Sequence, residues 1–315
     1  MMNELESQLR QAQTHQEKIA ALNALSAATK PKDLNCASHY ANEAEQLARQ
    51  IGDQKGLANA LLNKALALAP RAQYNVAHEL LSEAHRLFEQ LGDEKGRANV
   101  LSNFGSLSVM TGDFTKALSF TQESLRLRQE IGDKIGEAAS LNNLGAIHHY
   151  LGSFDAALAC FLKSLNIKEA IDDVHGKAHT LGNIGTVFRR TGNAERALAY
   201  HRESLLLWQQ LGDKLGEART RGEIGILLAE ASQLDQAIHE LEVAKSMFEA
   251  CHNPHGLANT HRSLADIYRL QHHLEKAFSE IRAGLRHSEI IGDKYGEMHA
   301  CFILGTLYSL RRHGD

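Results

Sequence analysis

The chain has 315 residues, of which 43% are hydrophobic and 23% charged, and its formal net charge is −4. This composition excludes a disordered chain, and so small a net charge indicates neither nucleic-acid nor membrane binding. No apolar run approaches the roughly 18 residues of a membrane span, and the N-terminal MMNELESQLR lacks a signal-peptide core. Only three prolines and 6% aromatic residues, with abundant alanine and leucine, favour an all-α fold. The four cysteines form no CxxC pair, which fits free thiols in the cytoplasm.

A six-residue marker recurs along the chain at a constant spacing of 40 residues. It reads IGDQKG at 51, LGDEKG at 91, IGDKIG at 131, IDDVHG at 171, LGDKLG at 211, CHNPHG at 251 and IGDKYG at 291. In its common form the glycine suits the left-handed position after a helix, and the aspartate suits the N-cap of the next helix. A fixed period of this length is the signature of a repeat protein.

In chain order, residues 1–55 read as a degenerate capping repeat that begins with a short helix over about residues 4–11. Here Leu25 replaces a glycine of the later repeats, and KPKDLN (30–35) replaces a TGDF-like turn. Residues 56–295 form six regular repeats. Residues 296–315 form an incomplete last repeat, with a first helix over about 296–310 followed by RRHGD. We therefore expect one solenoid over residues 1–315.

Each regular repeat reads as two antiparallel helices, because apolar residues recur with a period of 3.6 on either side of a short break. In the repeat that follows residue 135, the break is LGSF (151–154). The first helix carries its stripe at Ala138, Leu141, Leu144, Gly145 and His148, and the second carries it at Ala157, Phe161 and Leu165.

Three columns of small residues predict close helix packing. The position of Ala157 is alanine at 37, 77, 117, 157, 197, 237 and 277. The position of Gly145 is glycine at 105, 145, 185, 225 and 305, and alanine at 65 and 265. We interpret Gly136 and its equivalents as clearance against the preceding helix.

This pattern resembles the tetratricopeptide repeat (TPR) family, whose Leu-Gly, alanine and aromatic columns match Leu144, Gly145, Ala157 and Phe161. The resemblance covers essentially the whole chain. Two features depart from the usual family pattern: the period is 40 residues, as in kinesin light chain-like and bacterial signalling TPR proteins, and Gly-Asp replaces the proline that ends a typical repeat. The family implies a right-handed α-solenoid superhelix in which the first helix of each pair lines a concave groove.

Asparagine recurs at one position of the narrow polar strip left on the first helices. The position holds Asn23, Asn63, Asn103, Asn143 and Asn183, and later Glu223, Ser263 and Ile303. Each asparagine costs about 0.6 kcal/mol relative to alanine in a helix interior, so the five together are a noticeable sacrifice. A side-chain amide donates and accepts hydrogen bonds at once, so a ladder of amides could hold an extended peptide backbone, as in TPR proteins resembling this one. Inheritance by duplication, or bonds to neighbouring helices, is the alternative.

The same strip is locally basic from the middle of the chain onward. It carries His149, Tyr150, His179, Arg189, Arg190, Arg219, Arg262 and Arg269, against Glu223, Glu230 and Asp266. Arginine can clamp a carboxylate through two hydrogen bonds, which favours an acidic partner segment or a free carboxylate. Ordinary solvated arginines are the alternative.

Metal and catalytic sites find little support in the sequence. His148 and His149 are adjacent on a helix and point about 100° apart, and His148 falls in a core column. In CHNPH (251–255), Cys251 takes the Ile/Leu position of the marker, so we expect a buried cysteine rather than a zinc ligand. His175 and His179 have no third ligand. We therefore expect no metal, no cofactor and no enzyme activity.

These observations predict a cytoplasmic protein- or peptide-binding module that binds neither nucleic acid nor membrane. It would be the sensory or scaffolding region of a larger signalling regulator, a free-standing adaptor, or a receptor for a small signalling peptide. The last helix presents Cys301, Leu304, Gly305 and Tyr308 in columns that a second helix covers in earlier repeats. We therefore expect a downstream domain or a second copy of the chain to cover that helix.

Overall fold

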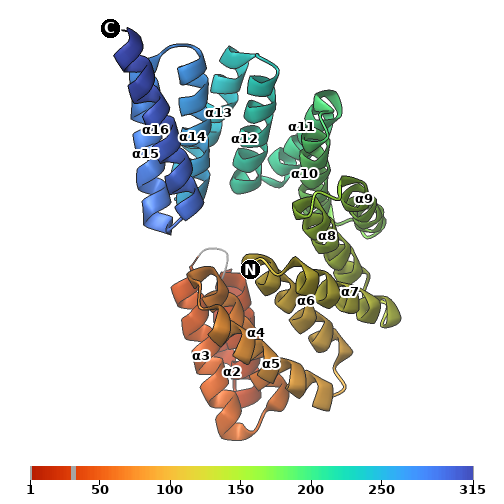
Figure 1. Cartoon of the computed structure of the whole chain (residues 1–315). Coiled ribbons are helices and arrows are strands. Elements are labelled where there is room, and N and C mark those ends of the chain that lie inside the picture. The colour runs from red at the N-terminus through yellow and green to blue at the C-terminus, as the bar shows by residue number, and fades with distance from the viewer. Residues whose placement is uncertain (1, 30–32, 315) are drawn as a thin grey trace. The chain divides into compact units, whose positions relative to one another are not determined.

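The computed structural model describes residues 2–29 and 33–314, and these form α-helices and one short 3₁₀ helix without any strand (Figure 1). The first helices are α1 (Met2–Gln11), α2 (His15–Thr29), α3 (Leu34–Ile51), α4 (Gln54–Leu68), η1 (Ala69–Arg71), α5 (Tyr74–Gln90), α6 (Glu94–Met110), α7 (Phe114–Glu130) and α8 (Lys134–Tyr150). The others are α9 (Phe154–Ala170), α10 (Val174–Arg190), α11 (Ala194–Leu211), α12 (Lys214–Glu230), α13 (Leu234–Ala250), α14 (Pro254–Leu270), α15 (Leu274–Ile291) and α16 (Lys294–Gly314). The predicted helix pairs and the short N-terminal helix are confirmed, and part of the first predicted connection lies outside the described residues.

The helices fall into two compact units, which we call the N-terminal unit (Met1–Ile167) and the C-terminal unit (Lys168–Asp315). Within each unit, consecutive helices pack against one another, and the first helices of successive pairs also touch, such as α4 with α6 and α10 with α12. One hydrophobic cluster joins buried residues of α4 to α6 in the N-terminal unit, and another joins buried residues of α12 to α16 in the C-terminal unit. No helix of the described chain is both long enough and apolar enough to cross a lipid bilayer.

The marker forms the connection between repeats as its sequence predicts. Gly132 has a φ of 70°, which an L-residue with a side chain rarely adopts, so glycine ends the helix there. The next residue, Asp133, caps α8 by accepting a hydrogen bond from the backbone N–H of Gly136 at 3.2 Å. These two residues fix the phase at which each new repeat begins.

The small-residue columns have the packing role predicted for them. A Cβ atom on Gly145 would lie 2.6–2.9 Å from the ring of Phe161, and one on Gly136 would collide with the guanidinium of Arg128. The alanines of the Ala157 column are at most 1% exposed. Glycine and alanine are therefore required where two helices approach most closely.

Two details of the prediction need correction. Cys251 is exposed rather than buried, because the marker position that it occupies lies at the end of a helix; its counterparts Ile51, Leu91, Ile131 and Leu211 are also exposed. The last helix is longer than predicted at both ends. Asp293 caps its start by accepting from the N–H of Gly296 at 2.9 Å, and near its end Arg311 lies 3.5 Å from Glu275.

Candidate functional site

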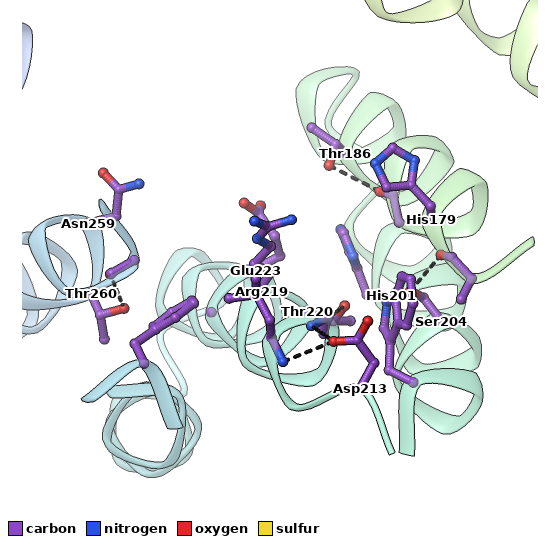
Figure 2. A pocket seen from close by; sticks show the side chains of 18 of the residues that line it. His179, Thr186, His201, Ser204, Asp213, Arg219, Thr220, Glu223, Asn259 and Thr260 are labelled. Atoms are coloured by element: carbon purple, nitrogen blue, oxygen red, sulfur yellow. Dashed lines mark hydrogen bonds between the residues drawn. The ribbon is translucent and has the colours of Figure 1, made fainter. Parts of the chain in front are cut away.

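A hollow of about 470 Å³ opens on the C-terminal unit, between helices α10 to α14. Figure 2 shows side chains reaching it from four of these helices, among them His179 of α10, His201 of α11, Glu223 of α12 and Asn259 of α14. The hollow is large enough for side chains of a bound segment, and its walls combine polar groups with an apolar floor.

The walls come from the polar strip of the first helices. The 40-residue period places His179, Arg219 and Asn259 at the same helix position in α10, α12 and α14. One turn further along, the equivalent position presents Asn183, Glu223 and Ser263. The strip identified in the sequence therefore faces a real concavity here.

The floor comes mainly from the second helices. Trp208 of α11 and Phe248 of α13 are 6% and 4% exposed and line the base of the hollow. The ring of His175 stands edge-on to Trp208, with 4.8 Å between the ring centroids. The floor is thus a rigid aromatic surface held by the packing between repeats.

Two glycines leave extra space in the hollow, although no neighbouring atom requires a glycine at either position. Gly182 and Gly222 lie in the middle of α10 and α12 and line the hollow. A Cβ on Gly222 would meet no atom within 4 Å, and one on Gly182 would meet only the Ser204 hydroxyl at an ordinary 3.6 Å. A glycine inside a helix costs about 1 kcal/mol relative to alanine. Since neighbouring atoms do not require these glycines, the space that they leave is the feature to be explained.

Most of the predicted arginine clamps are already engaged by the protein itself. Arg189 lies 2.9 Å from Glu230 and 3.7 Å from Glu223. Arg269 pairs with Asp266 of its own helix at 3.2 Å, and Arg262 donates a hydrogen bond to Asn259. Arg190 and Arg219 are exposed and form no ion pair with any described residue. Of these two, Arg219 is the one that lines the hollow.

Burial perturbs three ionisable groups around the hollow. Desolvation and the nearby Arg189 lower the pKa of the buried His201 to about 4. Desolvation, Lys168 and Arg219 lower the pKa of His179 to about 4, although its side chain is exposed in the hollow. Desolvation raises the pKa of Glu223, and the nearby Arg189 opposes this effect. Both histidines are therefore neutral at physiological pH.

In the N-terminal unit, three of the four asparagine side chains at the repeated position bind their own chain. The amide of Asn63 donates to the backbone carbonyl of Asn23 at 3.1 Å and to its side-chain oxygen at 3.2 Å. Asn23 in turn donates to the carbonyl of Gly56 at 3.0 Å, and Asn103 donates to the carbonyl of Asn99 at 2.7 Å. Asn143 is half-buried and has no hydrogen-bond partner among the described residues.

The twelve residues predicted for the groove are divided between the two units. Five belong to the N-terminal unit: Asn63, Asn103, Asn143, His149 and Tyr150. There Tyr150 is 65% exposed and stacks on Phe114, and His149 is half-buried beside Phe154. The hollow brings together three of the others, His179, Asn183 and Arg219.

His201 and the two glycines of the hollow were not among the residues predicted from the sequence. His201 occupies the column that holds Phe161 and Leu241 in the neighbouring repeats, so a polar side chain in an apolar column was the available signal. The helix-interior Gly182 and Gly222 were a second signal. A metal site has no support in the described part of the chain, where no three histidine, cysteine or acidic side chains gather around one point.

Comparisons with known proteins agree with this architecture. A family model described as tetratricopeptide repeat matches residues 96–170 and 176–250. Residues 96–170 and 176–250 are therefore tetratricopeptide repeats. No curated protein sequence matches it.

Three solved structures share the fold at low sequence identity. A Rap protein complexed with competence and sporulation factor has a TM-score of 0.73 and 16% identity, over 93% of this chain and 80% of that one. The Rap conjugation gene regulator of plasmid pLS20, in complex with the Phr* peptide, has a TM-score of 0.67 and 15% identity, over 88% and 76%. Aspartyl phosphate phosphatase F from Bacillus subtilis has a TM-score of 0.67 and 13% identity, over 90% and 73%. At these identities the likeness concerns the fold alone.

Proposed function

We propose that the C-terminal unit binds an extended peptide segment of a partner in the hollow between α10 and α14. The observation that carries this proposal is the pair of helix-interior glycines, Gly182 and Gly222, which open the hollow although the packing does not require them. The solved Rap structures with a bound factor or peptide support it, because their fold is similar.

The charges of the hollow favour an acidic residue at one end of the segment. Arg219 lines the hollow and has no carboxylate partner among the described residues, so it can clamp a carboxylate of the ligand. Neighbouring asparagines such as Asn183 and Asn259 carry amides that can donate to and accept from a peptide backbone. Arg189 and Arg262 contact two residues that line the hollow, Glu223 and Asn259, and so support its walls.

Binding rather than catalysis is the role that we propose, in a cytoplasmic regulator or adaptor or in a receptor for a signalling peptide. The four cysteines, Cys36, Cys160, Cys251 and Cys301, are all free thiols, as expected in a reducing compartment.

The outer face of α16 supports a second protein contact. Tyr295, Met298 and Phe302 are 67%, 62% and 70% exposed and lie about one turn apart. Met298 takes the position at which six earlier first helices have a buried alanine. We propose that a second copy of the chain or a neighbouring domain covers this face. Light scattering of the isolated chain would show the mass of a dimer in the first case.

Filling the hollow tests the main proposal. The substitution Gly222→Leu adds a side chain where a Cβ meets no atom, so the protein should fold and its melting temperature should not fall. Random peptides displayed on phage and selected on wild-type protein should lose at least about tenfold in affinity for this variant. Gln210→Leu, at an exposed position of α11 outside the hollow, is the matched control. Equal peptide binding by all three proteins would contradict the proposal.

A further inference from the structure

Four buried polar atoms without a hydrogen-bond partner lie on three successive helices beside the hollow. They are Nδ1 and Nε2 of His201, Nε of Arg189 and Oε2 of Glu223, each with less than 1 Å² of exposed surface and no partner among the described residues. Nε of Arg189 and Oε2 of Glu223 are 3.7 Å apart, which is too far for a hydrogen bond. Folded proteins satisfy nearly all such atoms, so a cluster of four requires an explanation.

Packing explains the size of His201 but not its nitrogen atoms. The side chain is 1% exposed and fills the space above Gly185, where a Cβ would lie 2.7 Å from the ring. In the preceding repeat, Phe161 fills the equivalent space above Gly145 without any polar atom. In the following repeat, Leu241 does the same above Gly225. An apolar side chain would therefore suffice for the fold at position 201.

His201 and Glu223 both line the hollow, and Figure 2 shows them reaching it from α11 and α12. The four atoms comprise two donors and two acceptors, because a neutral imidazole has one N–H and one bare nitrogen. A ligand that satisfies both kinds must itself donate and accept. A carboxylate only accepts and an ammonium group only donates, whereas a carboxamide has two N–H groups and an oxygen with two lone pairs.

The charges at this level of the hollow also disfavour an anion. Arg189 is flanked by two carboxylates, those of Glu223 and Glu230. A ligand carboxylate would add a third negative charge beside a neutral imidazole. Arg219, which has no ion pair with a described residue, lies one helical turn before Glu223 on α12 and also lines the hollow.

We propose that the part of the hollow between His201 and Glu223 binds the side-chain carboxamide of an asparagine or glutamine in the partner peptide. This proposal rests on the proposed peptide-binding function and adds the residue type that the site selects. It makes His201 a specificity-determining residue whose nitrogen atoms distinguish a carboxamide from an apolar or acidic side chain.

Selection of displayed random peptides on wild type and on His201→Phe tests the proposal. The substitution reproduces the Phe161–Gly145 pair of the preceding repeat, so the variant should fold, which a thermal melt verifies. On wild type, asparagine and glutamine should be enriched about tenfold at one position of the bound peptides, as expected for hydrogen bonds to buried groups. Peptides should still bind to the His201→Phe variant, but asparagine and glutamine should no longer be enriched at that position. The control is His239→Ala, which removes an exposed histidine of α13 outside the hollow.

A spectroscopic measurement on wild type gives an independent readout. A selected peptide should shift the ¹⁵N resonances of the His201 ring, and the same peptide with leucine in place of the carboxamide residue should not.

The possible results separate the two proposals. If both proteins select peptides with the same residue preferences, or if wild type selects aspartate and glutamate at that position, the carboxamide proposal is wrong and peptide binding stands. If wild type captures no peptide, both proposals are wrong.

Discussion

The polar side chains along the first helices have different partners in the two units. In the N-terminal unit, Asn63 bonds to Asn23 of the preceding repeat, and Asn103 bonds to its own helix. In the C-terminal unit, the equivalent positions face a hollow that Gly182 and Gly222 enlarge, next to the unsatisfied His201. The repeated position therefore contacts mainly the protein's own chain in the N-terminal unit and lines the hollow in the C-terminal unit, where Asn183 also has a hydrogen bond with His179.

This difference shows that a residue repeated at one position does not have one role. An amide with a partner within the chain is explained by the fold, whereas buried nitrogen atoms without one require another partner, which we propose is a ligand. His201, and pairs of like residues with different surroundings, provide tests of this difference.

The largest expected effect is on the pH dependence of stability. The pKa of His201 is lowered to about 4 in the folded protein, whereas an unfolded histidine titrates near 6.5. Above pH 6.5 both states are neutral, so His201 has no effect; as the pH falls from 6.5 to 4, only the unfolded state gains the proton. Wild type should therefore lose about 3 kcal/mol of unfolding free energy relative to His201→Phe over this range. Urea unfolding at a series of pH values measures this difference, and parallel pH profiles would contradict it.

Replacement by alanine should change the stability in opposite directions for a glycine that is packed against a side chain and for a glycine beside open space. Gly145→Ala places a Cβ against the ring of Phe161 and should lower the free energy of unfolding by about 1–2 kcal/mol. Gly222→Ala meets no atom and should raise it by about 1 kcal/mol, because alanine is the better helix former. Chemical denaturation of both variants is the measurement. A loss of stability in Gly222→Ala would mean that the packing needs this glycine after all.

The smallest expected effect is a difference in stability between the alanine variants of two asparagines in the N-terminal unit. Asn63→Ala removes two hydrogen bonds to Asn23 and should lower the free energy of unfolding by about 0.5–1 kcal/mol. Asn143→Ala removes no bond to a described residue and should raise it by about 0.6 kcal/mol through helix propensity. Thermal melts of the two variants side by side would show the difference in sign. If Asn143→Ala is the more destabilising, the amide of Asn143 is structural.

The sequence was sufficient to predict the repeat architecture because each repeat serves as a comparison for the others. Gly132 and Asp133 determine where each helix ends and begins, and the clearance needed by Phe161 and Arg128 determines where glycine recurs. These requirements are local and recur in most repeats, so they leave a periodic signal.

The candidate site was only partly predictable, because its chemistry depends on contacts between repeats. The partner of Asn63 lies 40 residues earlier in the chain, and Arg189 pairs with Glu230 on the next first helix. The sequence shows that these side chains share a face but not which of them bind one another. His201 was missed for a related reason: its column was interpreted through the apolar residues of the other repeats.

The aromatic floor of the hollow also has a use in measurement. Trp208 is the single tryptophan of the chain, it is 6% exposed, and it lines the hollow. Fluorescence excited selectively in tryptophan therefore originates from this one place. A peptide that enters the hollow should change the emission, as should any event that admits water to its floor. Unfolding confined to the N-terminal unit should leave the emission unchanged, so this intrinsic signal reports on the C-terminal unit alone.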